Sequence, residues 1–297
     1  DPGQEEPVKP GKQVLSFAAA IAFAAIALPA AAQTVLNVNT ALTTDDPMYA
    51  GLERMKANVE KRSAGKLQIR IFPGSQLGKD EDVLEQARAG ANVAVLVDGG
   101  RLAPFVKEFG IMGAPYLVDN FDQVLRLQQS ALFKGWVEKL RGAANLQVLS
   151  FDWFQGHRHM LTNVPVKVPA DLKGVRVRTP GAPVWLETVR AMGATPTGMP
   201  WSEVYSALQT KVIDGAEAQH PAVYGARLYE VVKIITKTEH IYLITGIVTS
   251  RAWFDKLPAD QQAILSEESF AAGKWASEAT IASLADYEKK LREKGAT

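Results

Sequence analysis

Residues 172–221 constrain the fold of this chain more than any other segment. Residues 175–180 alternate Val and Arg and stop at a proline, which is typical of a strand with its basic side chains on one face. Residues 184–192 and 202–210 have the spacing of two helices, and residues 212–217 have the composition of a second short strand that leads into a turn. The segment therefore predicts short strands that alternate with helices.

The second helix of this segment has a start signal of its own. Ser202 is expected to be the N-cap, because its hydroxyl can accept a hydrogen bond from an exposed amide of the first turn. Tyr205 and Leu208 are three residues apart and predict the buried face of this helix.

Composition places the chain among ordinary globular proteins. Its 297 residues suffice for one large or two ordinary domains, and 47% hydrophobic residues can form a sizeable core. The net charge of +1 argues against nucleic acid as a partner, because nucleic-acid binders carry a basic excess. The absence of cysteine excludes a thiolate nucleophile, disulfides and Cys-ligated zinc, and it is compatible with export without proving it.

The first 32 residues have the features of a leader. Residues 1–12 are polar and rich in Pro and Gly, and residues 14–28 form an apolar run that is too short for the roughly 20 residues of a membrane span. Ala30-Ala31-Ala32 then supplies a cleavage site before Gln33. We interpret residues 1–32 as a signal peptide; the alternative is a buried Ala-rich helix of the mature fold.

The next segment predicts a parallel sheet. Strands are expected at residues 33–39, 67–72 and 93–97, and amphipathic helices at residues 46–64 and 80–89. This βαβαβ order is typical of an α/β domain.

The remaining chain alternates in the same way. Residues 121–141 are expected to be largely helical, and residues 146–152 and 241–250 to be strands. Residues 228–237 fit either a strand or a helix end, and residues 258–294 predict a long helical region with charged faces.

Several of these segments together resemble one protein family. The motifs are LKGVRVRTP, GATPTGMPWSEVYSALQTKVIDGAE and YEVVK in the central region, with GKLQIRIFPGSQLG and GAPYLVDNFDQV before it. They resemble the DctP-type solute-binding proteins of tripartite ATP-independent periplasmic (TRAP) transporters, and the match covers nearly the whole chain after residue 32. Family members usually continue for a few dozen residues past the position of Thr297, so we expect a truncated chain.

The resemblance implies an α/β fold of the type II (Venus-flytrap) class, with two domains, a ligand cleft between them and a long connecting helix. The implied domain I comprises residues 33–155 plus about 244–283. The implied domain II comprises residues 156–243 plus about 284–297.

Two arginines are the first candidates for ligand binding. By resemblance, Arg178 is the family's ligand-clamping arginine, and a planar guanidinium can hold a carboxylate through two parallel hydrogen bonds. The alternative is a surface arginine on an edge strand, and Arg176 serves as a comparison that we expect nearer to solvent. Arg158, after Gly156 and His157, resembles the family's second arginine; the alternative is a structural salt bridge.

Polar residues at two strand ends are further candidates. Asp98 follows a buried strand, and ligands of open α/β sheets bind at the carboxyl ends of strands. Its carboxylate could accept a hydrogen bond from a substrate hydroxyl or ammonium group, or it could simply cap a helix or turn. Asn39 ends the first strand in the same way, with a looser match to the family.

The segment after residue 214 departs from the family pattern. Family members typically have D-G-x-E followed by an Asn that contacts the ligand, whereas here Glu217 is followed by Ala218. Gln219 or His220 could replace this Asn. Glu217 itself is expected to orient Arg178 or to line the site.

Aromatic residues cluster near these positions, namely Trp153, Phe154, Trp185 and Trp201. Trp201 lies where the family keeps an aromatic ring against the body of the ligand, and Phe154 is a second candidate for the ligand wall. An aromatic wall suits a ligand with a flat or apolar part beyond its carboxylate. The alternative is that these rings belong to the core.

Three histidines, His157, His159 and His220, lie in the same segments. They make a metal site conceivable, but the chain has no Cys and no H-E-x-x-H motif, so we expect neither a metal nor a cofactor. The sequence also lacks G-x-S-x-G, a P-loop and a dinucleotide-binding fingerprint.

These observations predict a periplasmic binding protein that is not an enzyme. It would capture a small carboxylate by domain closure and deliver it to TRAP membrane permease subunits, as the resemblance implies. Candidate ligands are 2-hydroxy or 2-oxo acids, aromatic acids, sugar acids and dicarboxylates. One alternative is a periplasmic enzyme that acts on an organic acid with His157 or His220 as the base; another is an amine or sugar ligand, which two unneutralised arginines would oppose if it were a cation.

Overall fold

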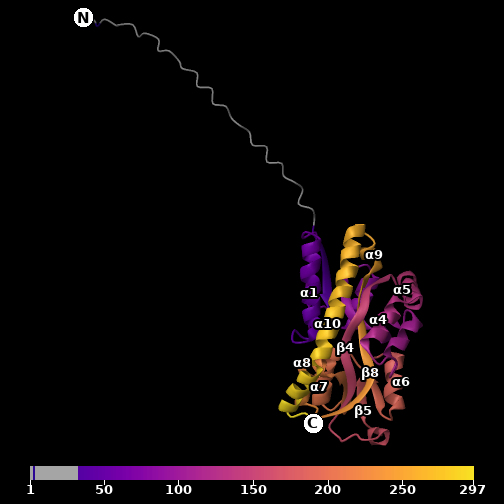
Figure 1. Cartoon of the computed structure of the whole chain (residues 1–297). Helices are drawn as coiled ribbons and strands as arrows, with labels where there is room; N and C mark the ends of the chain where they lie inside the picture. The colour runs from indigo at the N-terminus through magenta and orange to yellow at the C-terminus, as the bar shows by residue number, and fades with distance from the viewer. Residues whose placement is uncertain (1–2, 4–32) are drawn as a thin grey trace. The chain divides into compact units, whose positions relative to one another are not determined.

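One mixed sheet organises the part of the chain that the structure, a computed structural model, describes: residue 3 and residues 33–297 (Figure 1). Within this part the sheet has eight strands in the order β2-β1-β3-β8-β4-β7-β5-β6. We call β2, β1 and β3 the β1 side of the sheet, and β7, β5 and β6 the β5 side. The predicted leader, residues 1–32, lies outside the described residues apart from Gly3.

The β1 side confirms the predicted βαβαβ order. Its elements are β1 (Thr34–Asn39), α1 (Pro47–Arg62), β2 (Leu67–Phe72), α2 (Asp80–Arg88) and β3 (Val93–Asp98). β1 is parallel to both β2 and β3. Asp46 caps α1 by accepting from the amide of Met48, and Pro47 at the first helical position has no amide that would need a partner.

Short helices follow β3. They are α3 (Gly99–Leu102), the 3₁₀ turn η1 (Lys107–Gly113), α4 (Phe121–Gln129) and α5 (Ala131–Ala144). The predicted helical region 121–141 is thus two helices, which divide at Ser130. The Ser130 side chain accepts from the amide of Phe133 and so begins the second helix.

The β5 side repeats the parallel arrangement. Its elements are η2 (Pro169–Leu172), β5 (Arg176–Thr179), α6 (Pro183–Ala191), β6 (Thr195–Gly198), η3 (Trp201–Glu203), α7 (Val204–Gln209), β7 (Gly215–Gln219), α8 (His220–Gly225) and η4 (Leu228–Glu230). β5 pairs in parallel with both β6 and β7.

Two predicted boundaries on this side are wrong. Ser202 is not an N-cap, because it lies inside the 3₁₀ turn η3, and α7 starts only at Val204. The strand expected at residues 212–217 starts at Gly215, since Val212 is 54% exposed and belongs to the turn before it.

Two strands of 17 residues join the sides: β4 (Leu146–Thr162) and β8 (Ile234–Ser250). They pair antiparallel along their whole length, and register shifts interrupt the ladder four times between Val148 and Met160. The predicted strand at residues 146–152 is only the first half of β4. Gly156, in the middle of β4, has a φ of +116°, a conformation that glycine adopts without strain.

The helix α10 (Ala259–Glu293) follows the short α9 (Arg251–Phe254) and confirms the predicted long helix. Figure 1 shows α10 running beside β4 and α1. Among the described residues, only the last part of β4 pairs with β7. The first part of β4 therefore has a free edge, and α10 covers this edge. There the Ser277 hydroxyl donates to the carbonyl of Asp152 (2.7 Å) and accepts from the amide of Phe154 (2.8 Å), which satisfies backbone groups that a strand would otherwise pair.

Apolar side chains fill both faces of the β1 side. One cluster, with Phe109, Phe133 and Phe151, packs under α4 and α5, and another, with Trp153, packs under α1 and α10. A further cluster lies between α7, α8 and β7. Among the helices in the described residues, none has the length and apolar character that crossing a membrane requires.

We expect Asp152→Asn to gain stability relative to the wild type as the pH rises. Asp152 has no exposed surface, and burial raises the pKa of its carboxyl group from 3.8 to about 7. The stability that this pKa difference gives to the folded wild type is therefore complete below pH 3.8, the unfolded pKa, and is lost as the pH rises to about 7, the folded pKa.

Denaturant unfolding of both proteins between pH 4 and pH 8 measures this effect. The difference in unfolding free energy should change by up to about 1.4 kcal/mol per pH unit and level off above the folded pKa. A difference that does not depend on pH would contradict the prediction.

Candidate ligand-binding cleft

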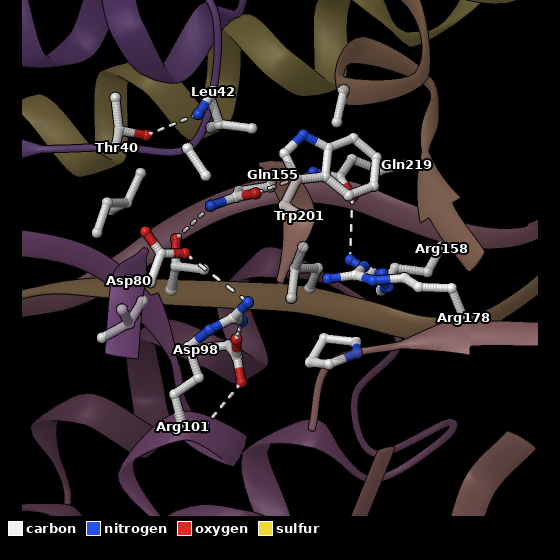
Figure 2. A pocket seen from close by; sticks show the side chains of 17 residues that line it. Thr40, Leu42, Asp80, Asp98, Arg101, Gln155, Arg158, Arg178, Trp201 and Gln219 are labelled. Atoms are coloured by element: carbon white, nitrogen blue, oxygen red, sulfur yellow. Dashed lines mark hydrogen bonds and ion pairs between the residues drawn. The ribbon is translucent and has the colours of Figure 1, made fainter. Parts of the chain in front are cut away.

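A cavity with about 50 Å³ of free space lies where the two sides of the sheet face each other. Its wall is drawn from the loop after β1, the start of α2, the end of β3, the middle of β4 and β8, and the ends of β5 and β7. Figure 2 shows the polar side chains that converge on it, which are Thr40, Asp80, Asp98, Arg101, Gln155, Arg158, Arg178 and Gln219, with Trp201 beside them.

Arg178 is buried at the cavity wall, with 1% of its surface exposed. Its Nε and Nη2 donate to the carbonyl of Met199 at 2.8 and 2.6 Å, and its guanidinium lies 5.3 Å from the ring centre of Trp201. Among the described residues, no carboxylate lies within 4.0 Å of it, in contrast to Arg158. Burial, followed by the nearby charge of Arg158, lowers the pKa of Arg178 to about 9, so it remains a cation at neutral pH.

The comparison residue Arg176 confirms the expected contrast. It is exposed and forms an ion pair with Asp214 (2.8 Å) on the outside of the sheet. The two side chains, two positions apart on β5, therefore meet different surroundings: Arg178 lies at the cavity wall and Arg176 at the surface.

Arg158 is neutralised by Glu217. The two side chains form a two-pronged ion pair, in which Nε contacts Oε2 and Nη2 lies 2.6 Å from Oε1. Burial alone would raise the pKa of Glu217, but Arg158 and then His240 outweigh burial and lower this pKa to about 2. The salt bridge considered as the alternative for Arg158 is therefore present, and Arg158 also lines the cavity.

Glu217 does not contact Arg178 through a hydrogen bond and does not line the cavity. It accepts from Arg158 and from the Thr179 hydroxyl (2.8 Å), so it orients Arg158 rather than Arg178. The expectation of two unneutralised arginines is corrected accordingly, because Arg158 has its carboxylate.

Asp98 both lines the cavity and caps a helix. Its Oδ1 accepts from the amide of Arg101 at 3.2 Å, and its Oδ2 pairs with the Arg101 side chain. Oδ1 also accepts from Nε1 of Trp185 (3.1 Å), which comes from the β5 side. Arg101 contacts Glu81 as well (2.9 Å) and lies 3.7 Å from Asp80. Burial lowers the pKa of Arg101, but these acids outweigh burial and raise it above the ordinary value.

Amide side chains connect the middle of the cavity. The Gln219 amide donates to Oε1 of Gln155 (2.9 Å), and the Gln155 amide donates to the Thr245 hydroxyl (3.2 Å). Arg158 donates to Oε1 of Gln219 (3.3 Å). Gln219 thus lines the cavity at the place where we expected a substitute for the missing Asn, whereas His220 does not.

The aromatic candidates divide into one cavity residue and three core residues. Trp201 lines the cavity. Phe154 does not: its ring stacks on Tyr242 (3.8 Å between centres) in the core under α4 and α5. Trp153 and Trp185 are buried, and Trp185 lies under the Arg158 guanidinium (4.9 Å).

Asn39 is buried but is not part of the cavity wall. Its side chain accepts from the amide of Leu77 (3.1 Å) and donates to the carbonyl of Gly78 (3.3 Å), so it holds the loop before α2. Its neighbour Thr40 reaches the cavity instead.

The histidines lie apart from the cavity. The rings of His159 and His220 are tilted to each other with centres 4.4 Å apart, and burial lowers the pKa of His159 to about 3. Within the described part of the chain, no three His, Asp or Glu side chains are grouped so that they could hold a metal ion.

Sequence reasoning missed five polar wall residues: Thr40, Asp80, Arg101, Gln155 and Thr245. Signals existed for two of them. Asp80 opens α2, and helices that follow strands point their first turn toward the carboxyl edge of the sheet. Arg101 comes three residues after Asp98, the spacing at which helical side chains meet.

The two sides of the sheet are joined by long strands and one long helix, and a polar cavity lies between them. This arrangement defines a two-domain type II solute-binding protein. Residues 38–297 match the family described as bacterial extracellular solute-binding protein, family 7, and the chain belongs to that family. The resemblance to TRAP solute-binding proteins is thereby confirmed.

Similar proteins include the C4-dicarboxylate-binding periplasmic protein DctP of Vibrio cholerae, 34% identical over 77% of this chain and 68% of that protein. A TRAP solute-binding protein of Escherichia fergusonii, solved in an apo open form, is 47% identical, with a TM-score of 0.76 over 89% of this chain and 88% of that one. One from Actinobacillus succinogenes with bound L-galactonate is 31% identical, with a TM-score of 0.87 over 89% and 87%.

We expect Glu217→Gln to destabilise the protein strongly. The variant leaves the buried Arg158 without its countercharge, and breaking a buried pair costs about 3–5 kcal/mol. The melting temperature should fall by roughly 10 °C. Asp214→Asn is the matched control, because it removes an exposed ion pair with Arg176 on the neighbouring strand and should have little effect. Equal losses in the two variants would contradict this prediction.

Proposed function

We propose that this protein is the extracytoplasmic solute-binding subunit of a TRAP transporter. In the periplasm it captures a small organic acid, which it delivers to the membrane permease. One observation carries the proposal. Arg178 presents to a polar cavity a buried guanidinium that has no carboxylate partner among the described residues. A bound carboxylate would supply the missing charge.

The electrostatics of the cavity support an anionic ligand. Burial and Arg158 lower the pKa of Arg178, which means that its charged form is disfavoured while the site is empty. An anion beside it would reverse this effect, whereas a cationic ligand would add to it. The ligand of the A. succinogenes relative, L-galactonate, is likewise a carboxylate.

Domain closure is the second part of the proposal. We propose domain I as residues 33–155 plus about 244–283, and domain II as residues 156–243 plus about 284–297. The crossing points in β4 and β8 then coincide, since Gly156 pairs with Leu243 next to a register shift. A flexible glycine beside an interrupted ladder suits a hinge.

The comparisons support a closed arrangement. The structure is more similar to the galactonate-bound relative (TM-score 0.87) than to the open apo relative (0.76), although the latter is closer in sequence. A ligand that contacts both domains selects the closed form, because it gains contacts there that the open form lacks.

The protein carries out no chemistry on its ligand in this proposal. His157 and His220, the bases considered for an enzyme, do not line the cavity. The polar wall residues instead make hydrogen bonds and ion pairs among themselves, which suits recognition.

We expect Arg178→Ala to abolish the ligand-induced thermal shift. The test screens aldonates, uronates, 2-oxo acids and C4-dicarboxylates; a ligand at 100 times its Kd stabilises the fold by about 2.7 kcal/mol. Arg178→Lys retains the charge but loses the two-pronged geometry, so it should keep only a small part of the shift. Arg176→Ala, on the exposed side of the same strand, should respond like the wild type.

Circular dichroism of each variant without ligand checks that the fold is intact. A carboxylate that binds Arg178→Ala as tightly as the wild type would refute the clamp. Conversion of a bound acid into product, followed by NMR, would refute the role as a binding protein.

A further inference from the structure

The charges of the cavity are distributed unevenly between its two ends. Figure 2 shows Arg158 and Arg178 at one end, and Asp80, Asp98 and Arg101 at the other. Arg158 is paired with Glu217 and Arg101 with Asp98, so neither guanidinium is available to a second anion without losing a partner. Among the described residues that line the cavity, Arg178 is the cation without an acidic partner.

Asp80 is the acid of the cavity wall whose negative charge is least neutralised by a nearby cation. It is 8% exposed, and its nearest cation, Arg101, lies 3.7 Å from Oδ2. Its other oxygen, Oδ1, is buried and has no hydrogen-bond partner among the described residues. Asp80 therefore brings negative charge and unused acceptor capacity to the wall opposite Arg178.

We propose that the ligand is a hydroxylated monocarboxylate whose single carboxylate binds Arg178 and whose hydroxyl groups donate to Asp80 and Asp98, and that Asp80 excludes a second carboxylate. This inference rests on the proposed function as an organic-acid binder. It goes further because it separates sugar-acid-type ligands from dicarboxylates, including the C4-dicarboxylates named for the V. cholerae relative.

The exclusion follows from the charge of the acidic end. A dicarboxylate that extends from Arg178 would place its second carboxylate against Asp80 and Asp98, where like charges repel in a site largely shielded from water. A terminal hydroxyl at the same place donates a hydrogen bond to an ionised acceptor, which is stronger than a bond between neutral groups.

The amide side chains of the cavity suit the same ligand. Gln155 and Gln219 line the same cavity, and each amide group offers both donors and acceptors. A chain of carbons with hydroxyl groups, each of which donates and accepts, can pair with such a wall along its length.

Matched ligand pairs that differ only at one end provide the test. Titration calorimetry at pH 8 compares galactonate with galactarate, gluconate with glucarate, and 4-hydroxybutyrate with succinate. Burial raises the pKa of Asp80 to about 6, so it is ionised at this pH. The wild type should bind a monocarboxylate at least about 100-fold more tightly than its dicarboxylate partner.

Asp80→Asn removes the negative charge and keeps an acceptor of similar size. It should reduce this preference at least about tenfold, chiefly by improving dicarboxylate binding. The matched control is Asp82→Asn, an exposed carboxylate on the same helix, which should leave the preference unchanged. Melting curves of both variants show whether the fold is retained.

The outcomes separate this inference from the proposed function. Dicarboxylates that bind the wild type as tightly as their monocarboxylate partners, in a manner that depends on Arg178, would overturn the inference and leave the binding function intact. A preference unchanged in Asp80→Asn, or tighter binding of an amino acid than of any hydroxy acid, would also overturn it. Failure of every carboxylate to bind would refute the proposed function itself.

Discussion

The buried carboxylate of Glu217 sets the charge of the whole cleft. It holds Arg158 in a two-pronged ion pair and accepts from Thr179, so it links β4, β5 and β7 at the point where the cavity forms. A pKa of about 2 keeps it ionised at any physiological pH. Without it, two buried guanidiniums would face each other, and Arg158 already disfavours the charge on Arg178. Because Glu217 neutralises one arginine, the other is the one that the proposed function assigns to a ligand.

The second constraint is that one sheet serves both sides of the cleft. β4 and β8 can run through the molecule only if their ladder tolerates a bend, and the register shifts provide it. Ser277 of α10 satisfies the amide and carbonyl of β4 that no strand pairs. The long helix thus stabilises the same segment of β4 that carries Gln155 and Arg158 into the cavity.

The sequence predicted those parts of the fold and the site that depend on local pattern. Asp98 could be found because it follows a buried strand, whereas Arg178 was singled out through the resemblance of its segment to the family and not through the pattern of its strand. Phe154 and Gln155 show the limit: neighbours on a strand point to opposite faces, and a shift in register decides which of them faces the cavity. Asp80 and Arg101 approach each other only when α2 and α3 pack together. No pattern within a single segment of the sequence could therefore predict this pair.

The balance between open and closed forms follows from the same contacts. In the proposed division, the polar contacts that cross between the domains without a ligand include the buried hydrogen bonds from Trp185 to Asp98 and from Gln219 to Gln155 (2.9 Å), and the exposed pair of Lys79 with Glu203 (2.6 Å). A buried hydrogen bond contributes about 1 kcal/mol, and an exposed ion pair contributes little.

The charge of Arg178 is disfavoured in the empty cleft, because burial and then the nearby charge of Arg158 lower its pKa from 12.5 to about 9. In the proposed function, an anion that enters the cavity removes this penalty, so the charge that binds the ligand would also favour the form that encloses it.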